Sequence, residues 1–548
     1  MRRLTRKDAL ALLPCAAVFL FLHGRVFLSG RIYFHDDLSI TTHPWARFAA
    51  DALQGGRLPL WDPYDSFGLP FIGSMQFGTF HPAALAFYLF PYGTALGCFL
   101  SFVFAFAAVG AYLLLRRLGL SRAAAGGGAL LFSCGGYLHG HAQFPFHVAT
   151  LAHLPWLALL AGEALVGPLA FAQAFWAGYP PFFVWVALPC ALARGRAGLR
   201  ALALGVLLCA QVWLPGLELF HSSDRRGGNP AGQTAYSLAP ADLAGVVRPA
   251  LIRVFAAAPA ASPGVSEFSW DGPEGRRRFR FPSLPDDGLR GPWGIKLTYM
   301  KCFYLGAVGF ALALAGLAAL GRRRPAAAAA AAATAAAGLF LALGENFGPA
   351  AFLWRHAPFL RLLREPNRLT WLAAVAGAYL AAQGLDALGR RWGRRARAAA
   401  LLLAAAELAV LGAGLFPSVP GDFYREKGPL FDFLQARLDG RRYLQTPDVY
   451  LWYDPLPSPE PEGYGDFRMA MFRAFAQRGH FTESLSYRLS HIQSPGYLAM
   501  LPAGSRREIE ELRRRAADGA GLSDALKRAC ARYVLEPDRR LPEGDGLR

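Results

Sequence analysis

Two adjacent acids, Asp36 and Asp37, follow the first strongly apolar run of the chain and open a polar stretch that continues to Pro82. Paired carboxylates at the mouth of a membrane helix are costly unless they face water, a partner or a substrate. One carboxylate could act as a general base on an acceptor hydroxyl, and its neighbour would raise its proton affinity. The alternative is a cap on the following helix segment, because aspartate is favourable at a helix start. Adjacency alone does not decide which acid would act.

Histidines in the same stretch could add a divalent metal to this chemistry. His35, His43 and His81 are the candidate ligands in this stretch, and His139 and His141 of the later segment HGHAQ are similar candidates. Imidazole and carboxylate groups suit several divalent metals, but these spacings match no standard metal motif. Hydrogen-bonded histidines near a membrane interface are the alternative. The sequence therefore indicates no definite cofactor and leaves a divalent metal open.

The composition indicates a membrane protein. Of 548 residues, 54% are hydrophobic and only 17% are charged, which is too apolar for an ordinary soluble chain of this size. The net charge of +19 comes from arginines that recur as short clusters at the ends of apolar runs. That placement indicates membrane orientation and excludes nucleic acid as the expected partner. The seven cysteines show no CxxC pairing, so neither a disulfide framework nor a structural zinc site is expected.

The pattern of apolar runs predicts a mainly α-helical, polytopic bundle with roughly 11 spans, since a span needs about 20 apolar residues. The N-terminal run has no small-residue cleavage site, which favours a retained helix over a signal peptide. A short apolar pair broken at GYPP (178–181) is expected to be a broken or re-entrant segment that lines a protein cavity. The predicted spans are 8–27, 92–115, 123–138, one ending near 163, the pair within 168–192, 199–219, 302–320, 326–343, 369–388 and 398–416.

The positive-inside tendency then places the N-terminus in the cytoplasm and the acidic loop outside. The predicted multi-span domain is 1–417, with outer loops 29–82, 221–300 and 344–367. Within the second loop, the apolar patch 246–258 is interrupted by arginines and is expected to be an interfacial helix. Residues 418–548 are polar and are expected to form a small extracytoplasmic α/β domain, with strands at 440–447 and 531–537 and a helix at 505–519.

Several segments resemble a known family. The run GGRLPLWDPYDSFGLPFIGSMQFGTFHP (55–82) resembles the first-loop signature of bacterial YfhO-type membrane proteins, which are related to GT-C glycosyltransferases. The segments AGYPP, QVWLPGLELFHSSDR, TAYSLAP, LALGENFGP and LREPNRLTWLAAVAGAYLAAQGLDAL follow in the family's order, to about residue 390. The chain departs from the pattern at HGHAQ (139–143), where many GT-C enzymes have a second acid.

The resemblance implies a GT-C-like core whose first outer loop carries an acid. It implies transfer of a sugar from a polyprenyl-phosphate carrier to a cell-envelope acceptor polymer, with inversion at the anomeric carbon because no second carboxylate is evident. Asp36 or Asp37 would be the base. The alternatives are a transporter or flippase of lipid or polysaccharide, or a non-catalytic envelope-assembly protein. The expected location is the bacterial inner membrane, in contact with the lipid bilayer.

Basic outer-loop residues are candidates for the donor phosphate, because guanidinium groups match phosphate and can stabilise a departing phosphate. These are Arg364, Arg368, Arg225 and Lys301, with interfacial anchoring as the alternative role. Trp61, Tyr64 and Gln76 are candidates for contact with the sugar or acceptor. For the two aromatics, scaffolding of a Pro- and Gly-rich loop is the alternative.

Overall fold

The chain is described here from a computed structural model. The structure describes residues 5–33, 38–64, 68–223, 237–247, 302–357, 360, 365–413 and 418–420, and the backbone of 265–272 and 275–282. After residue 420 it describes 434–437, 439, 442–445, 490–491, 507–508, 511–512, 514–515, 529 and 531–535.

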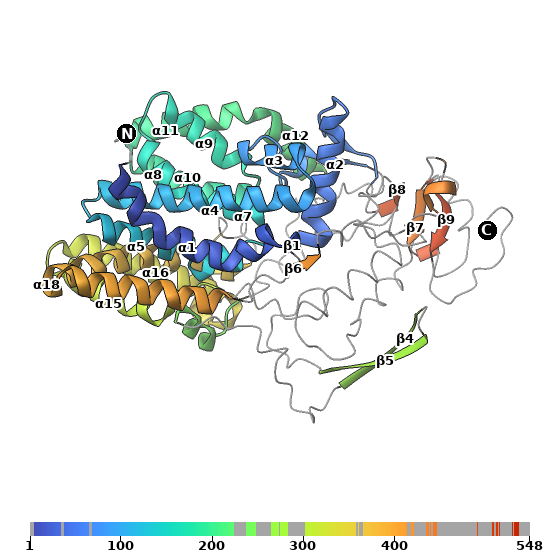
Figure 1. Cartoon of the computed structure of the whole chain (residues 1–548). Coiled ribbons are helices and arrows are strands. Elements are labelled where there is room, and N and C mark those ends of the chain that lie inside the picture. Colours follow the sequence, from blue (N-terminus) through green and yellow to red (C-terminus); the bar gives the residue numbers. More distant parts are fainter. Residues whose placement is uncertain are drawn as a thin grey trace.

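The described part of the chain is mainly α-helical, which confirms the predicted fold class at that level. The helices pack side by side in one bundle, and the short strands lie towards or beyond one end of it (Figure 1). The first half of the bundle contains α1 (Arg6–Leu28), α2 (His43–Gln54), α3 (Leu85–Leu89), α4 (Tyr92–Arg117), α5 (Arg122–Ser133), α6 (Gly136–Gly140), α7 (Pro145–Ala152) and α8 (Leu154–Leu160). The second half contains α9 (Val166–Trp176), α10 (Pro180–Leu192), α11 (Gly195–Leu208), α12 (Ala210–Ser222), α15 (Gly306–Gly321), α16 (Pro325–Ala342), α17 (Gly348–His356) and α18 (Thr370–Gly412).

Three described helices are long and apolar enough to cross a membrane: residues Arg6–Gly24 of α1, all of α4, and α16. A fourth is counted if α11 and α12 form one bent span. α10 and α15 are apolar but shorter. The larger number of crossings expected from the sequence stays a prediction.

Several stretches fold differently from the sequence prediction: the predicted span 123–138 is interrupted between α5 and α6, and the predicted outer loop 29–82 contains α2. The segment 199–219 was expected to be one span, but its helices α11 and α12 meet at a 75° bend. The bend lets α12 pack on the first outer loop, where Gly216 lies against Met75 and Gly73 lies against the Pro215 carbonyl. The predicted outer loop 344–367 contains the helix α17.

Two other helix breaks fall where the sequence prediction placed them, one at GYPP and one in the basic segment 389–397. α9 and α10 are separate helices on either side of GYPP, and α18 is a hairpin of two helices that turns at Gly393, where φ is +83°. A positive φ of this size favours glycine. The two halves of α18 run antiparallel, since Leu385 and Leu401 both lie over Gly127 of α5.

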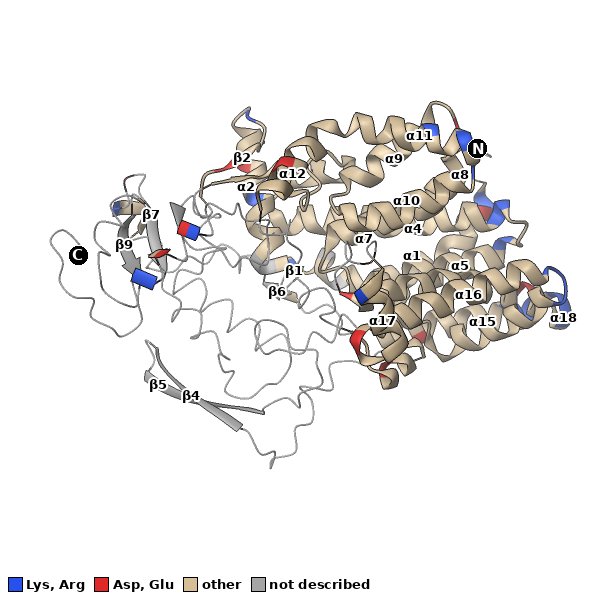
Figure 2. Ribbon diagram, turned by 180° about the vertical axis from the view of Figure 1, so that it is seen from behind, with Lys and Arg blue, Asp and Glu red and all other residues tan. Residues whose placement is uncertain are grey.

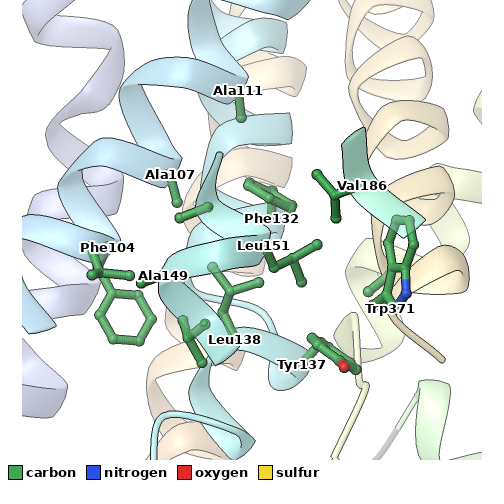
Figure 3. Packing of buried hydrophobic residues seen from close by; sticks show 14 of the residues in the cluster. Phe104, Ala107, Ala111, Phe132, Tyr137, Leu138, Ala149, Leu151, Val186 and Trp371 are labelled. Carbon is green, nitrogen blue, oxygen red and sulfur yellow. The ribbon is translucent and has the colours of Figure 1, made fainter. Parts of the chain in front are cut away.

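Small residues bring helix backbones together inside the bundle. A Cβ atom added at Gly316 of α15 would overlap the Leu380 carbonyl of α18, and one at Gly126 of α5 would overlap the Ala11 carbonyl of α1. Close approach at small residues is typical of helix pairs in membranes. Figure 3 shows part of the apolar core, to which α4, α5, α7 and α10 contribute Phe104, Phe132, Leu151 and Val186.

The arginine-rich turns gather at one end of the bundle (Figure 2). Contacts tie three of them together: Arg122 pairs with Asp8 at 2.9 Å, and Arg397 Nη1 donates to Ser121 Oγ at 3.0 Å. Arg390 also pairs with Asp386 at 2.7 Å. The grouping of these turns on one side therefore agrees with the sequence prediction.

Short strands lie towards the other end. β1 (Arg31–Tyr33) pairs antiparallel with β6 (Ser418–Pro420), which joins the start of the first outer loop to the start of the C-terminal segment. β2 (Trp61–Asp62) pairs with β3 (Leu69–Pro70), and β4 (Val265–Gly272) with β5 (Gly275–Pro282). β7 (Arg442–Gln445) is parallel to both β8 (Ser490–His491) and β9 (Ala531–Leu535).

The C-terminal strands β7 and β9 fall in the two segments predicted as strands, and the described residues of 505–519 are helical. An independent α/β domain stays a prediction. Most of the apolar patch 246–258, from residue 248 onward, lies outside the described residues.

Candidate functional site

Three polar motifs that are far apart in the sequence meet at the side chain of Arg368. Its Nη1 atom donates to the Tyr179 hydroxyl of GYPP at 2.7 Å and lies 3.0 Å from His147 Nδ1, at the end of HGHAQFPFH. Its Nε atom forms an ion pair with Glu365 of its own segment, REPNR. The Arg368 side chain is only 9% exposed. A guanidinium group in this position is desolvated and must be satisfied by its neighbours.

Local backbone geometry holds the Arg368–Glu365 pair in place. Glu365 has φ of +64°, which is unusual for a residue with a side chain. Pro366 then starts a short 3₁₀ helix, η9 (Pro366–Leu369), that leads into α18. The Tyr137 hydroxyl of α6 donates to the Arg368 carbonyl at 2.9 Å, so a second helix fixes this turn.

Aromatic rings surround the guanidinium group on the α7 and α10 side. The Arg368 Cζ atom lies 5.1 Å from the centre of the Phe144 ring and 5.2 Å from that of Tyr179. The His147 and Tyr179 rings are in close contact, with centres 3.5 Å apart. Cation–π contact of this kind is strongest where water is excluded.

Polar atoms near this cluster lack partners among the described residues. His141 Nε2 and both amide atoms of Gln143 are buried without a hydrogen bond there, and so is the indole nitrogen of Trp371. The Tyr137 and His141 rings stack with centres 4.2 Å apart, which places His141 beside the Arg368 turn. Figure 3 shows Tyr137 and Trp371 at the edge of the apolar core. Unpaired buried polar groups are costly, so this cluster has donor and acceptor capacity for a polar ligand group.

The chain just before the predicted base is anchored to the same HGHAQ motif. The Tyr33 hydroxyl and His23 Nδ1 are 2.7 Å apart, and the His23 and His139 Nε2 atoms are 2.8 Å apart. Both imidazoles are fully buried. Asp36, Asp37 and the candidate ligand His35 themselves lie outside the described residues.

His43 is a buried side chain in the first turn of α2. Its ring meets Tyr92 edge-on at 4.7 Å. Burial, helped by the nearby Arg47 charge, lowers the pKa of His43 to about 3. Among the described residues no group of three or more His, Cys, Asp or Glu side chains is arranged to hold a metal. Metal ligation by His43 therefore stays a prediction that involves residues outside the described part.

The candidate sugar-contact residues shape the first outer loop. Trp61 is 55% exposed and lies against Gly68, whose φ of +98° lets the backbone pass over the indole. The Tyr64 backbone N–H donates to Asp62 Oδ1 at 2.8 Å, and its ring meets Phe48 edge-on. Gln76 is half-buried after η2 (Ile72–Ser74). A scaffolding role for Trp61 and Tyr64 is thus visible, and contact with a sugar stays a prediction.

Of the four predicted phosphate-binding residues, the structure describes Arg368. Arg364, Arg225 and Lys301 lie outside the described residues. Sequence reasoning did not single out Tyr137, His147, Tyr179 or Glu365. The sequence feature that could have identified these four residues is the presence of polar side chains at helix breaks inside otherwise apolar runs. Gly178 adds a further link, since a Cβ there would lie 2.8 Å from the Gly78 nitrogen of the first outer loop.

No protein-family model and no curated protein matches the chain.

Proposed function

We propose that the protein is an inner-membrane glycosyltransferase of the YfhO-type, GT-C-like class, which moves a sugar from a polyprenyl-phosphate carrier to a cell-envelope acceptor. The proposal includes a polytopic bundle of roughly 11 crossings, counted at about 20 residues each, and a C-terminal α/β domain that helps to bind the acceptor. The basic turns would face the cytoplasm and the acidic loop would face outward.

The observation that supports this proposal best is the meeting of HGHAQFPFH, GYPP and REPNR around the buried Arg368. Structural needs alone do not require so many polar and charged side chains inside an apolar bundle, because polar groups there are costly and usually functional. One of these motifs, HGHAQFPFH, also contacts Tyr33 through His23. Tyr33 lies three residues before the acid pair.

In the proposed reaction, the oxygen of the acceptor hydroxyl attacks the anomeric carbon, and Asp36 or Asp37 takes the proton of that hydroxyl. The bond from that carbon to the carrier phosphate breaks, and the polyprenyl phosphate leaves with the electron pair. Arg364, Arg225 and Lys301 would stabilise the phosphate charge. Arg368 already has Glu365 as its ion partner, so we assign it the positioning of Tyr179 and His147 and a weaker share of the phosphate contact.

A transporter or flippase is the second candidate. The 75° bend between α11 and α12 and the break at GYPP resemble the discontinuous helices that transporters use for alternating access. The buried Arg368–Glu365 pair would then be part of a gate. In this case the acid pair would not be required for any bond-making step.

The test is transfer of sugar from a labelled polyprenyl-phosphate donor by purified protein in lipid. We expect transfer by the wild type, and a loss of at least about 100-fold in Asp36→Asn or Asp37→Asn, because a general base contributes that much or more. Glu163→Gln is the matched control, since Glu163 is an exposed acid outside the predicted outer loops.

Donor binding separates the possible failures. An acid variant that binds donor but does not transfer identifies the base. Full activity in both acid variants would refute the base assignment. A wild type that moves lipid-linked sugar across the bilayer without transferring it would favour the transporter, and one that does neither would favour an assembly role.

A further inference from the structure

The tip of the α18 hairpin carries four arginines around one exposed tryptophan. The sequence there is GRRWGRR (389–395), and Trp392 is 63% exposed. The Arg391 guanidinium lies 5.3 Å from the centre of the Trp392 indole ring. A tryptophan flanked by arginines is favourable at the level of lipid headgroups, because its ring has both an apolar body and a polar N–H group.

The acids near the tip are already paired with other arginines. Asp386 contacts Arg390 and Arg397, and Asp8 contacts Arg122. Arg391, Arg394 and Arg395 are exposed and have no acidic partner among the described residues. The tip therefore presents uncompensated positive charge.

Two neighbouring features extend this charge and place it beside apolar surface. The turn between α15 and α16 carries the exposed Arg322, Arg323 and Arg324, at the same end of the bundle (Figure 2). Further along α18, Leu402 and Leu403 are 65% and 60% exposed. The surface of α18 thus changes from exposed leucine to clustered arginine within a few helical turns. The same change from apolar to charged groups occurs between the acyl chains and the headgroups of a bilayer.

We propose that this hairpin tip is a binding site for anionic phospholipid headgroups. The phosphate groups would pair with Arg391, Arg394 and Arg395, and the Trp392 ring would lie among the glycerol and carbonyl groups. The site depends on insertion of the bundle in a bilayer but not on sugar transfer. An acidic protein bound to the same arginines is the competing occupant.

The experiment uses the full chain in phosphatidylcholine bilayers that contain a trace of spin-labelled phosphatidylglycerol. The selectivity for this lipid over spin-labelled phosphatidylcholine is measured for the wild type and for R394Q/R395Q. An arginine near the membrane surface is worth about 1 kcal/mol, or roughly a fivefold change in association per residue. We expect a preference for the anionic lipid that falls clearly in the variant and weakens in about 1 M salt.

The matched control is R47Q/R57Q, which removes the same charge from two exposed arginines of the first outer loop. It should keep the wild-type selectivity. Equal affinity of the wild type for the two labelled lipids, or an equal loss in both double variants, would overturn the proposal. Retained selectivity in a correctly folded R394Q/R395Q protein would overturn it as well and leave the acidic protein as the better occupant.

Discussion

At the scale of single residues, Arg368 organises the bundle interior. It contacts Glu365, Tyr179 and His147, which come from three separate segments, and its guanidinium group lies over the Phe144 ring. A buried ion pair contributes little to net stability, since desolvation offsets the Coulomb attraction, but removing one partner leaves an uncompensated charge. The pair is thus better explained by positioning than by stability.

This reasoning predicts the effect of neutral substitutions at the pair. Glu365→Gln or Arg368→Gln alone should destabilise the protein by about 3–5 kcal/mol, and the double substitution by less than the sum of the two. The measurement is the thermal unfolding midpoint in detergent, for the two single variants and the double variant.

The Arg355–Glu345 pair provides the control for this cycle. It has an ordinary distance of 2.6 Å but is largely exposed, at 65% and 34%. Its single substitutions should leave the unfolding midpoint close to that of the wild type, because water screens exposed ion pairs. If both pairs behave alike, Arg368 is not desolvated in the way described.

At the scale of elements, the bundle depends on helix pairs that approach through glycine. α15 and α18 cross at Gly316 and Gly384, where an added Cβ would overlap the carbonyl oxygen of the partner helix. The last residue of α15, Gly321, is open: a Cβ there would meet Ala328 at 4.0 Å. One helix therefore offers both a tight and a loose glycine.

We predict opposite outcomes for alanine at these two positions. Gly316→Ala should separate α15 from α18 and cost about 1–3 kcal/mol, as overpacking usually does. Gly321→Ala should be neutral or slightly stabilising, since alanine is the better helix former. Unfolding midpoints in one detergent test this, and a Gly316→Ala protein as stable as the wild type would show that the crossing is looser than described.

At the scale of the whole molecule, the two ends of the bundle differ in charge and in structure. One end carries the arginine-rich turns, and the other carries β1, the first outer loop and η9, next to the Arg368 cluster. Under the positive-inside tendency, this asymmetry predicts that the basic end faces the cytoplasm.

Cysteine labelling tests this orientation. In a background without the seven native cysteines, Gly348→Cys should react with an impermeant maleimide in intact cells. Arg323→Cys should react only after the membrane is permeabilised. Both positions are exposed, one at the start of α17 and one in the α15–α16 turn. The reverse pattern would place the acidic loop in the cytoplasm and exclude an outward-facing base.

Much of the element pattern could be predicted from the sequence. The bounds of α4 and α16, the break at GYPP, the turn within 389–397 and the strands β7 and β9 all follow from local signals. These signals are runs of apolar residues, Pro and Gly at GYPP, the arginine cluster between two apolar runs, and strand-forming residues. These features depend on residues that are close in the sequence.

The bend at Cys209 and the site around Arg368 could not be predicted in this way. Beyond the bend, α12 packs on the first outer loop, and that contact joins residues 73–75 to residues 215–216. Arg368 was predicted on an outer face as a phosphate ligand, because a sequence shows a charge but not its burial or its partner.

The sequence by itself determined that this is an apolar, mainly helical chain with basic turns and with polar motifs at its helix breaks. Only the tertiary structure decided that HGHAQFPFH, GYPP and REPNR surround one buried guanidinium group. The physical reason is that hydropathy and helix breaks are properties of neighbouring residues, whereas pairing across more than 180 residues depends on how the helices pack.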